Sequence, residues 1–327
     1  MDVRVLNETE IRGLIGPAEA LAAVRDAFAA FAQGRATLPD ALGLEFPDRE
    51  GEAHVKGAYL HDAPYWSIKA ATGFYRNPER GLPVTGGVSL VFSATTGLLD
   101  TLLFDNGYLT ELRTGAAGAL AADLLAKPEI EQVLIVGSGG QARYQLTALL
   151  LVRRPRRVVA FGRRSASAQA YVDEMRGQHD LDIAIATDLA DAVAGSDLIV
   201  TTTPARSPII QAAWLRPGVH LTAMGSDFPE KQEIDVAALA RADLVVADHP
   251  QQALLNGEVH HAVAAGAIRA DDVVALGAIV SGTVPGRTDD NQITIADLTG
   301  LGIQDAAVAA AVVDLATQRD VGRQLAM

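Results

Sequence analysis

The sequence predicts an α/β protein with a doubly wound parallel sheet and a second, β-rich domain. From Gln132 onward, short apolar runs alternate with helical sequence, and each run has the length of one buried strand: VLIV, RVVAF, DIAIA, DLIVTTT, VHLTAM and DLVVAD. Between Leu42 and Phe104 the strands are longer and separated by Pro and Gly, with a turn near Thr96 and Gly97. That second pattern predicts an antiparallel sheet.

Composition supports a well-packed protein of two domains. The chain has 327 residues, of which 49% are hydrophobic and 20% are charged. The net charge of −13 opposes binding to nucleic acid or to an anionic membrane. The absence of cysteine excludes disulfides, thiolate metal sites and a cysteine nucleophile. The first residues, MDVRVLNETE, lack the pattern of a signal peptide, so we expect a cytoplasmic protein.

Helix signals set the expected domain boundaries. After a strand near Val3–Leu6, Asn7 and Glu10 have the spacing of a capping box, and apolar spacing predicts a helix over Ala18–Ala32. A helix rich in small residues at 110–126 connects the domains, and a helix at 306–319 packs back onto the first. We therefore expect residues 1–120 and 304–327 to form an α+β substrate-binding and dimerisation domain, and residues 121–303 to form the parallel-sheet domain.

A glycine-rich turn follows the first strand of the parallel sheet. In QVLIVGSGGQA, the residues Gly137, Gly139, Gly140, Gln141 and Ala142 lie between a strand and a helix. The first glycine permits a tight turn, the second lets the backbone approach a diphosphate, and the small alanine allows close packing of helix on strand. This context predicts a Rossmann-type dinucleotide site, the alternative being a purely structural turn.

The end of the next strand bears on the choice of dinucleotide. An acidic residue that binds the ribose 2′-hydroxyl is common there in NAD-selective domains, but RVVAF continues into Gly162, Arg163, Arg164 and Ser165. Paired guanidinium donors and a hydroxyl suit a 2′-phosphate, which favours NADP(H) over NAD(H). The alternative is that the arginines are solvated loop charges and Ser165 caps a helix.

Polar residues also follow two later strands, where ligands bind in open α/β sheets. Thr202 and Thr203 follow one strand, and Met224 and Asp227 follow another. We expect the threonines and the methionine at the edge of the cofactor site, although ordinary turn chemistry explains the threonines equally well.

Several blocks along nearly the whole chain resemble the ornithine cyclodeaminase/mu-crystallin family. They are NPERGLPVTGGVSLVF, GYLTELRTGAAGALAADLLA, VLIVGSGGQAR, AMGSDFPEKQEID, GEVHHAVAAG and TGLGIQD, in the order of the family. The resemblance implies an NAD(P)-dependent enzyme of imino or amino acids. It also implies a homodimer that pairs the N-terminal strands of two chains.

The resemblance implies roles for particular residues. Lys69 holds the position of the lysine that meets the substrate, and Arg113 that of an arginine that contacts the substrate carboxylate or the cofactor. Asp227 matches the acidic residue that moves protons in cyclodeaminases, while Thr85 and Thr114 match cofactor contacts. A lysine stem along the sheet surface and a turn-capping aspartate are the structural alternatives.

Two departures from the family pattern concern the substrate. The segment with His54 and Lys56 carries a cation where ornithine-handling members carry a carboxylate, and the usual upstream arginine is not evident in PDALGLEFPD. A site with His54, Lys56, Lys69 and Arg113 suits a dianionic substrate, as in the iminosuccinate reductase and ectoine-utilisation branch. We therefore predict reduction of a small imino acid. The alternatives are an ornithine cyclodeaminase and a mu-crystallin-like binding protein without catalysis.

The adjacent pair His260-His261, after Glu258, could indicate a metal site. No third ligand accompanies it at a recognisable spacing. We predict no metal.

Overall fold

The computed structural model describes residues 2–326, which divide into two compact units. The first unit combines residues up to 113 with residues from 301 onward, and the second spans 114–300. The boundaries expected from the sequence, after residues 120 and 303, lie a few residues further along the chain. Helix α3 (Tyr108–Leu125) contains the first boundary, because Arg113 bonds within the first unit whereas Gly115 packs against Tyr144 of the second. Among the described residues, no helix has the length and apolar character needed to cross a bilayer.

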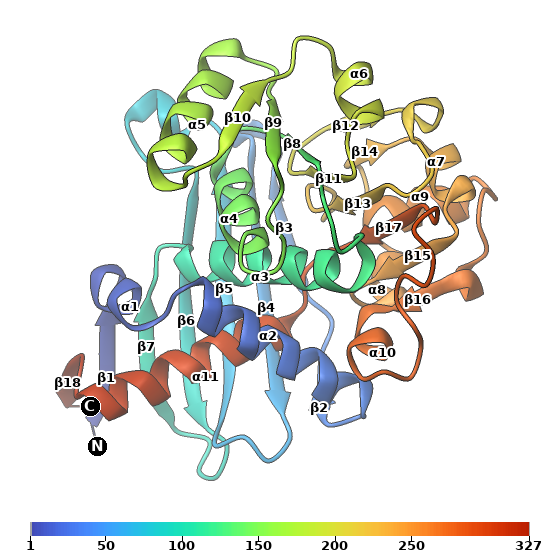
Figure 1. Ribbon diagram of the computed structural model, residues 1–327. Coiled ribbons are helices and arrows are strands. Elements are labelled where there is room, and N and C mark those ends of the chain that lie inside the picture. The colour runs from blue at the N-terminus through green and yellow to red at the C-terminus, as the bar shows by residue number, and fades with distance from the viewer. Residues whose placement is uncertain (1, 327) are drawn as a thin grey trace. The chain divides into compact units, whose positions relative to one another are not determined.

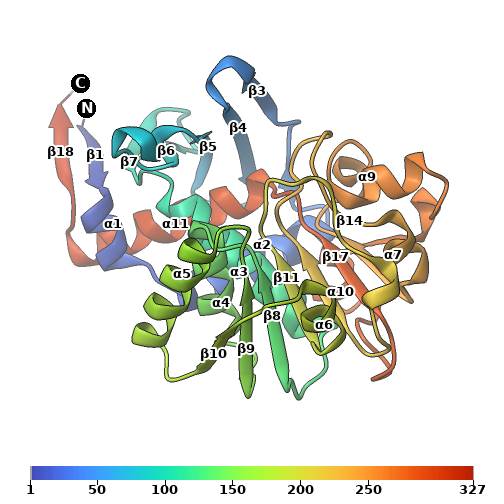
Figure 2. The same cartoon turned by 90° about the horizontal axis from the view of Figure 1, so that it is seen from above.

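The first unit is built on an eight-stranded sheet with the order β18-β1-β7-β6-β5-β4-β2, in which β3 pairs with β4. Strands β4 to β7 are antiparallel, as predicted, whereas β1 pairs in parallel with β7. Strand β18 pairs with β1, so the two ends of the described chain lie side by side (Figure 2). The strands are β1 (Asp2–Asn7), β2 (Ala36–Thr37), β3 (Leu42–Phe46), β4 (Gly51–Leu60), β5 (Tyr65–Phe74), β6 (Thr85–Ser93), β7 (Leu99–Phe104) and β18 (Arg323–Ala326).

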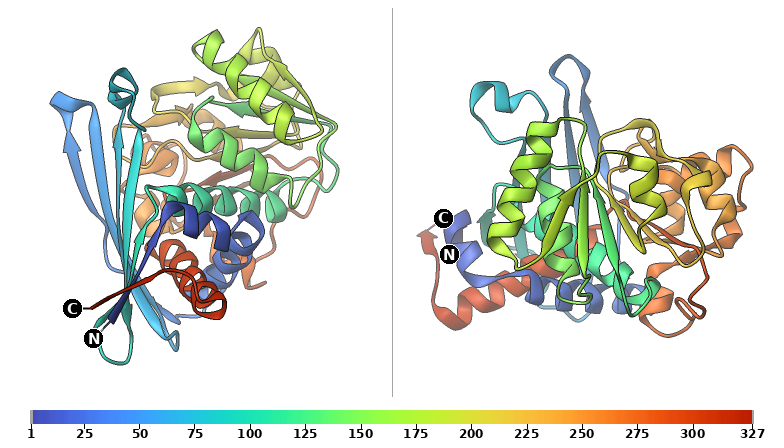
Figure 3. Two further views of the ribbon diagram at one scale, coloured as in Figure 1. Left: turned by 90° about the vertical axis from the view of Figure 1, so that its left-hand side faces the viewer. Right: turned by 45° about the horizontal axis from the view of Figure 1, so that its top comes forward.

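Two helices lie on one face of this sheet. Helix α11 (Gly302–Arg319) contacts β4 and β5, and α2 (Pro17–Ala32) packs against α11 (Figure 3). The C-terminal helix begins about one turn earlier than the apolar spacing predicted. Helix α1 (Glu8–Leu14) has the predicted cap, because the Asn7 side chain accepts from the N–H of Glu10 and the Glu10 side chain accepts from the N–H of Asn7.

The two faces of the sheet differ in burial, as the alternation of side chains along a strand requires. Ala58, Ser67 and Val91 are buried on the face that α11 covers. The opposite face is apolar and only half-buried, and we call it the outer apolar face. It includes Trp66, Ile68, Leu90, Phe92 and Leu102.

The second unit contains an eight-stranded parallel sheet with the order β10-β9-β8-β11-β13-β17-β15-β16. This is the Rossmann-type arrangement predicted from the alternating runs, and α4 and α5 pack against β8, β9 and β10 (Figure 1). The strand order reverses between β8 and β11, which is where such sheets bind ligands at the carboxyl ends of their strands. The strands are β8 (Gln132–Val136), β9 (Arg157–Phe161), β10 (Asp182–Ile185), β11 (Leu198–Thr201), β13 (His220–Ala223), β15 (Leu244–Ala247), β16 (Val273–Ala275) and β17 (Thr294–Asp297). The helices are α4 (Gly140–Leu149), α5 (Ser165–Gln178), α6 (Leu189–Ala194), α7 (Val236–Arg241), α8 (Pro250–Ala253), α9 (Gly257–Ala264) and α10 (Leu276–Val280).

Two strands of the second unit lie where helices were expected. The prediction of helical sequence after each apolar run is wrong after β11, where only a short 3-10 helix (Ala212–Trp214) follows, and is met after β13 only by α7. Before these helices, β12 (Arg206–Ile210) and β14 (Gln232–Ile234) form a small parallel sheet of two strands. Pro204, Pro208 and Pro229 explain the difference, because proline lacks an N–H and interrupts a helix.

Candidate functional site

The glycine turn after β8 has the geometry that a diphosphate site requires. Gly137 has φ +121°, and a Cβ there would lie 2.3 Å from Oγ1 of Thr202, so only glycine fits. Gly139 is the N-cap of α4, and a Cβ on it would meet nothing within 4 Å. The start of α4 at Gly140 is therefore open to a ligand, and its N–H groups suit an anion.

The residues after these glycines pack inside the second unit. Ala142 is buried and lets α4 lie close to the sheet. The Gln141 side chain accepts a hydrogen bond from Gln145 at 3.0 Å, and Gln145 also donates to the carbonyl of Thr114 at 2.9 Å. Thr114 therefore contributes its backbone to the packing of α3 on α4.

The loop after β9 lies against the glycine turn. A Cβ on Gly162 would come within 2.9 Å of Oγ of Ser138, in the middle of the GSGG segment. Arg163, Arg164 and Ser165 follow and are exposed, and neither arginine side chain bonds to another of the described residues. Arg164 is the N-cap of α5, so the alternative in which Ser165 caps this helix is wrong.

The ends of β11 and β13 are joined through a carboxylate that the sequence reasoning did not single out. Glu233 of β14 is completely buried and accepts from the N–H of Thr203 at 2.6 Å and from its hydroxyl at 2.7 Å. Thr202 donates to the carbonyl of Val136 through both its N–H and its hydroxyl. The N–H of Met224 donates a hydrogen bond to the carbonyl of Thr201. The only sequence signal for Glu233 was its place in the KQEID block.

Asp227 lies two residues beyond Gly225, in the loop after β13. Its carboxylate pairs with Nζ of Lys231 at 2.7 Å, and the lysine side chain is only 6% exposed. The Lys231 Nζ also lies 5.2 Å from the ring centroid of Phe228. The aspartate is thus held by a buried cation four residues further along the same loop.

Three cations gather in the first unit. Lys56 of β4 and Lys69 of β5 are directly paired in the sheet register, so both side chains point to the same face, and both are buried. His54 lies two residues before Lys56 on that face and is half-buried. We call Lys56, Lys69 and Arg113 the cation cluster.

Asp305, at the start of α11, supplies the negative charge that this cluster needs. Its Oδ1 accepts from Nζ of Lys69 at 3.1 Å and from Nε of Arg113 at 3.0 Å. Gln304 accepts from the same arginine at 2.8 Å. Oδ2 of Asp305 and Nε2 of Gln304 are buried and have no hydrogen-bond partner among residues 2–326. The site therefore presents an acceptor and a donor for a polar ligand.

The charges of this cluster alter the acidity of its members. Burial lowers the pKa of Lys69 to about 8, an effect that Asp305 opposes and that Arg113 and Lys56 strengthen. Burial also acts to raise the pKa of Asp305, but Arg113 and Lys69 outweigh it and hold that pKa below its usual value. Lys69 therefore carries a proton at neutral pH that it can release more readily than an exposed lysine.

The predicted site residues divide between the two units. Lys56, Lys69 and Arg113 share one cluster in the first unit, and His54 lies beside it. The glycine turn, Arg163, Arg164, the threonines after β11 and Asp227 belong to the second unit. Thr85 is exposed at the start of β6, where it adjoins Gly107. Asp305 was missed, although the TGLGIQD block contains it, because nothing in the local sequence shows which cations an aspartate will meet.

The histidine pair has a structural explanation within the second unit. A ring nitrogen of His260 bonds to the carbonyl of Leu254 at 2.9 Å, and one of His261 bonds to the carbonyl of Lys231 at 2.8 Å. Both rings thus connect α9 to neighbouring backbone.

Comparison with known proteins identifies the family. A sequence model of the ornithine cyclodeaminase/mu-crystallin family matches residues 1–320. The chain belongs to this family. An uncharacterized cyclodeaminase of Sinorhizobium fredii is 44% identical to it, with 98% of each chain covered. The resemblance inferred from the sequence blocks is therefore confirmed.

Solved structures of the ornithine cyclodeaminase/mu-crystallin family have the same fold. An archaeal alanine dehydrogenase dimer with bound NAD superposes with a TM-score of 0.92 at 36% identity, covering 100% of both chains. The iminosuccinate reductase of Paracoccus denitrificans, in complex with NAD+, gives a TM-score of 0.91 at 31% identity, also covering 100% of both chains. Dehydrogenases, imino acid reductases and cyclodeaminases are thus all represented among the relatives of this chain.

Proposed function

We propose that this protein is an NAD(P)H-dependent reductase that converts a small imino acid with two carboxylates, such as iminosuccinate, to an amino acid. The observation that carries the proposal is the buried cation cluster. It places Lys56, Lys69 and Arg113 around the carboxylate of Asp305. A substrate with two carboxylates compensates this charge better than a substrate with one, and the distal ammonium of ornithine would be repelled by Lys56.

The second unit fits a nicotinamide dinucleotide. Gly137 permits the tight turn, Gly139 leaves the backbone open at the start of α4, and both similar structures named above are complexes with NAD. Such a cofactor supplies the hydride when it is bound. We propose that NADP(H) is preferred, because the exposed Arg163 and Arg164 follow β9, where a carboxylate would select NAD(H).

The side chains of this chain have separate tasks in the proposed reaction. Arg113 and Lys69 bind and orient one substrate carboxylate, and Lys56 binds the other, with His54 beside it. The substrate nitrogen takes up a proton as it becomes an amine. Lys69 can give that proton at neutral pH because its pKa is about 8, and Asp227 is the second candidate for this transfer.

A turnover assay tests the proposal. The purified protein is mixed with NADPH or NADH and either iminosuccinate, formed from oxaloacetate and ammonia, or the monocarboxylate imine formed from pyruvate and ammonia. We expect net oxidation of the reduced cofactor, faster with the dicarboxylate. Release of ammonia from ornithine without net cofactor consumption would instead identify a cyclodeaminase. Cofactor binding without turnover of any imine would identify a binding protein.

Substitution of Lys56 tests the substrate class. Lys56→Glu should raise KM for the dicarboxylate by about 10-fold to 100-fold, because a charge-assisted hydrogen bond is replaced by repulsion. The KM for the monocarboxylate should change much less. Equal effects on both substrates would place Lys56 outside the binding site.

We also infer that the active form is a homodimer, with a second copy covering the outer apolar face. Trp66 and Phe92 stack on that face with ring centroids 4.3 Å apart, and both remain half-buried in the single chain. Sedimentation analysis should give twice the chain mass, and Leu90→Asp should yield a monomer.

The cytoplasmic location and the absence of nucleic-acid and membrane partners remain predictions from the sequence.

A further inference from the structure

Glu233 makes an unusual set of contacts for a side chain without an assigned role. Its Oε1 accepts from the N–H and the hydroxyl of Thr203, at 2.6 and 2.7 Å. Its Oε2 accepts from the hydroxyl of Thr201 at 2.7 Å and from the N–H of Gly225 at 2.8 Å. Each oxygen thus receives one backbone N–H and one hydroxyl, so the side chain acts only as an acceptor.

These four bonds connect two loops at the carboxyl edge of the parallel sheet. Thr203 follows β11 and Gly225 follows β13, and these strands are parallel neighbours. A Cβ on Gly225 would lie 2.1 Å from the carbonyl oxygen of Thr203, so the two loops touch through their backbones. Glu233 therefore fixes the distance between the two strand ends.

The same connections extend to both parts of the second unit's candidate site. On one side, Thr202 precedes Thr203 and packs against Gly137 of the glycine turn. On the other side, Gly225 precedes Asp227 by two residues. One buried carboxylate thus links the backbone of the glycine turn to the backbone that carries the aspartate.

Glu233 is itself held from helix α9. The Glu258 carboxylate accepts from the N–H of Glu233 at 2.8 Å and from the N–H of Ile234 at 3.1 Å. A ring nitrogen of His261 bonds to the carbonyl of Lys231. Because these bonds hold the backbone of β14 against α9, the position of the Glu233 carboxylate does not depend on the two loops alone.

We propose that Glu233 is a positioning residue that sets the spacing of the Thr201–Thr203 and Met224–Asp227 loops for cofactor binding. This inference rests on the proposed NAD(P)H-dependent function. It assigns to Glu233 no contact with the cofactor or the substrate. It acts through the hydrogen bonds that it accepts from the backbone N–H groups of Thr203 and Gly225.

The substitution Glu233→Gln removes this function with little change in volume. An amide has one acceptor oxygen and one donor NH2 group. Whichever way the amide is turned, its NH2 faces the N–H of either Thr203 or Gly225, and one loop loses its acceptor. Hydroxyl rotation cannot repair this, because a backbone N–H cannot become an acceptor.

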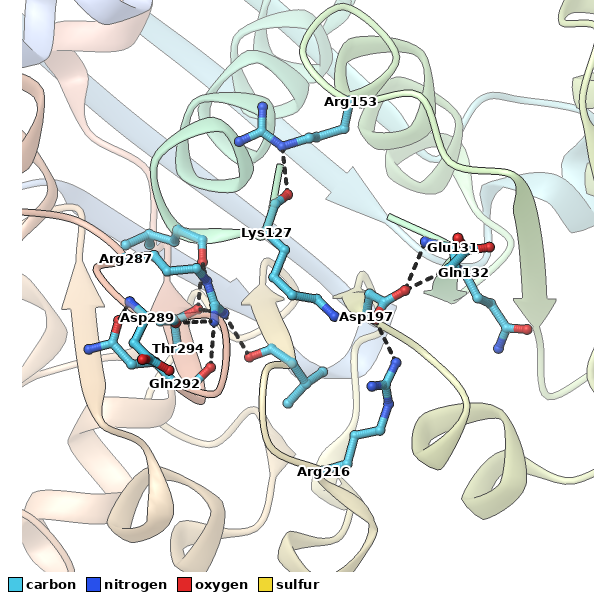
Figure 4. A network of polar contacts seen from close by, with 12 residues as sticks. Lys127, Glu131, Gln132, Arg153, Asp197, Arg216, Arg287, Asp289, Gln292 and Thr294 are labelled. Carbon is cyan, nitrogen blue, oxygen red and sulfur yellow. Dashed lines mark hydrogen bonds and ion pairs between the residues drawn. The ribbon is translucent and has the colours of Figure 1, made fainter. Parts of the chain in front are cut away.

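Asp197 provides a matched control at the opposite edge of the same sheet. Its Oδ2 accepts from the N–H groups of Glu131 and Gln132, at 2.8 and 3.2 Å, and its Oδ1 bonds to Lys127 and Arg216 (Figure 4). Asp197 thus joins the amino ends of β8 and β11 as Glu233 joins the carboxyl ends of β11 and β13. Asp197→Asn should loosen the sheet without reaching the edge where ligands bind.

Hydrogen exchange and cofactor binding together test the proposal. In the free protein, Glu233→Gln should speed amide exchange in residues 201–205 and 223–227, and Asp197→Asn should do so near residues 131–132. Calorimetric titration with NADPH and NADH should show binding weakened about 10-fold by Glu233→Gln, and within about twofold of the parent for Asp197→Asn. Circular dichroism checks that both variants are folded.

The outcomes separate this inference from the proposed function. If the parent binds NAD(P)H and Glu233→Gln binds equally well, or if both variants weaken binding equally, the positioning role is wrong and the proposed function stands. If the parent binds neither cofactor, both are wrong. If Glu233→Gln fails to fold, Thr203→Val takes its place, because it keeps the N–H of residue 203 but loses the hydroxyl that donates to Glu233. Unchanged loop exchange and unchanged cofactor affinity in that variant would also overturn the role.

Discussion

The carboxylate of Asp305 lies 3.1 Å from Nζ of Lys69, and both side chains are almost completely buried. The two residues are separated by 236 positions in the sequence. Helix α11 therefore supplies the charge that keeps a buried lysine protonated on β5. The protonation of the main candidate for substrate binding is decided by the last helix of the chain.

Asp305→Asn should lower the pKa of Lys69 below about 8, because the negative charge that opposes the effect of burial is removed. Since a lysine is protonated below its pKa, the alkaline limb of the kcat profile should move to lower pH. Asp314→Asn, an exposed position on the same helix, is the control. An alkaline limb at the same pH in all three proteins would show that Lys69 does not determine it.

Gly302→Ala should disturb the start of α11. A Cβ at Gly302 would lie 2.4 Å from the carbonyl oxygen of Gly57, so the helix must move away from β4. We expect a loss of about 1–3 kcal/mol in the free energy of unfolding of the first unit, measured with urea. Gly13→Ala meets nothing within 4 Å in helix α1 and should be neutral or stabilising. Equal stability of both variants would contradict this account.

Replacement of both Arg163 and Arg164 by alanine should reverse the cofactor preference. Loss of the guanidinium donors should raise KM for NADPH by about 10-fold or more and leave KM for NADH within about twofold. Arg156→Ala, an exposed arginine just before the opposite end of β9, is the control. A parallel loss with both cofactors would mean that the arginines contact a part that NADP(H) and NAD(H) share.

His220 should make the second unit sensitive to acid. Its ring is buried between hydroxyls of Thr222 and Thr294, each at 2.9 Å, and burial lowers its pKa from 6.5 to about 3. The stabilising effect of the neutral ring is complete above pH 6.5, the value in the unfolded chain, and is lost as pH falls toward 3.

Thermal unfolding between pH 7 and 5 tests this effect of His220. The parent should lose stability as pH falls, and His220→Gln should show a shallower slope even if it is less stable at pH 7. His61→Gln, at an exposed position after β4, should keep the slope of the parent. Identical slopes for the parent and His220→Gln would assign the acid sensitivity to other groups.

Local patterns were sufficient to predict much of the fold. Apolar runs followed by turns predicted the strands of the parallel sheet, and the glycines after β8 predicted a turn that requires the positive φ of Gly137. The capping box at Asn7 was also predicted correctly. These features depend on the backbone and on neighbours within a few residues, so the sequence near them carries the necessary information.

Partners from distant segments could not be predicted in this way. Glu233 lies 30 residues from Thr203, and Asp305 lies 192 residues from Arg113. A buried carboxylate must find donors, but the identity of those donors follows from strand order and helix packing. The sequence therefore predicted which strands and turns form and which lysine and arginine to consider. Only the tertiary structure decided which acidic groups hold them, because that choice depends on contacts formed after the chain has folded.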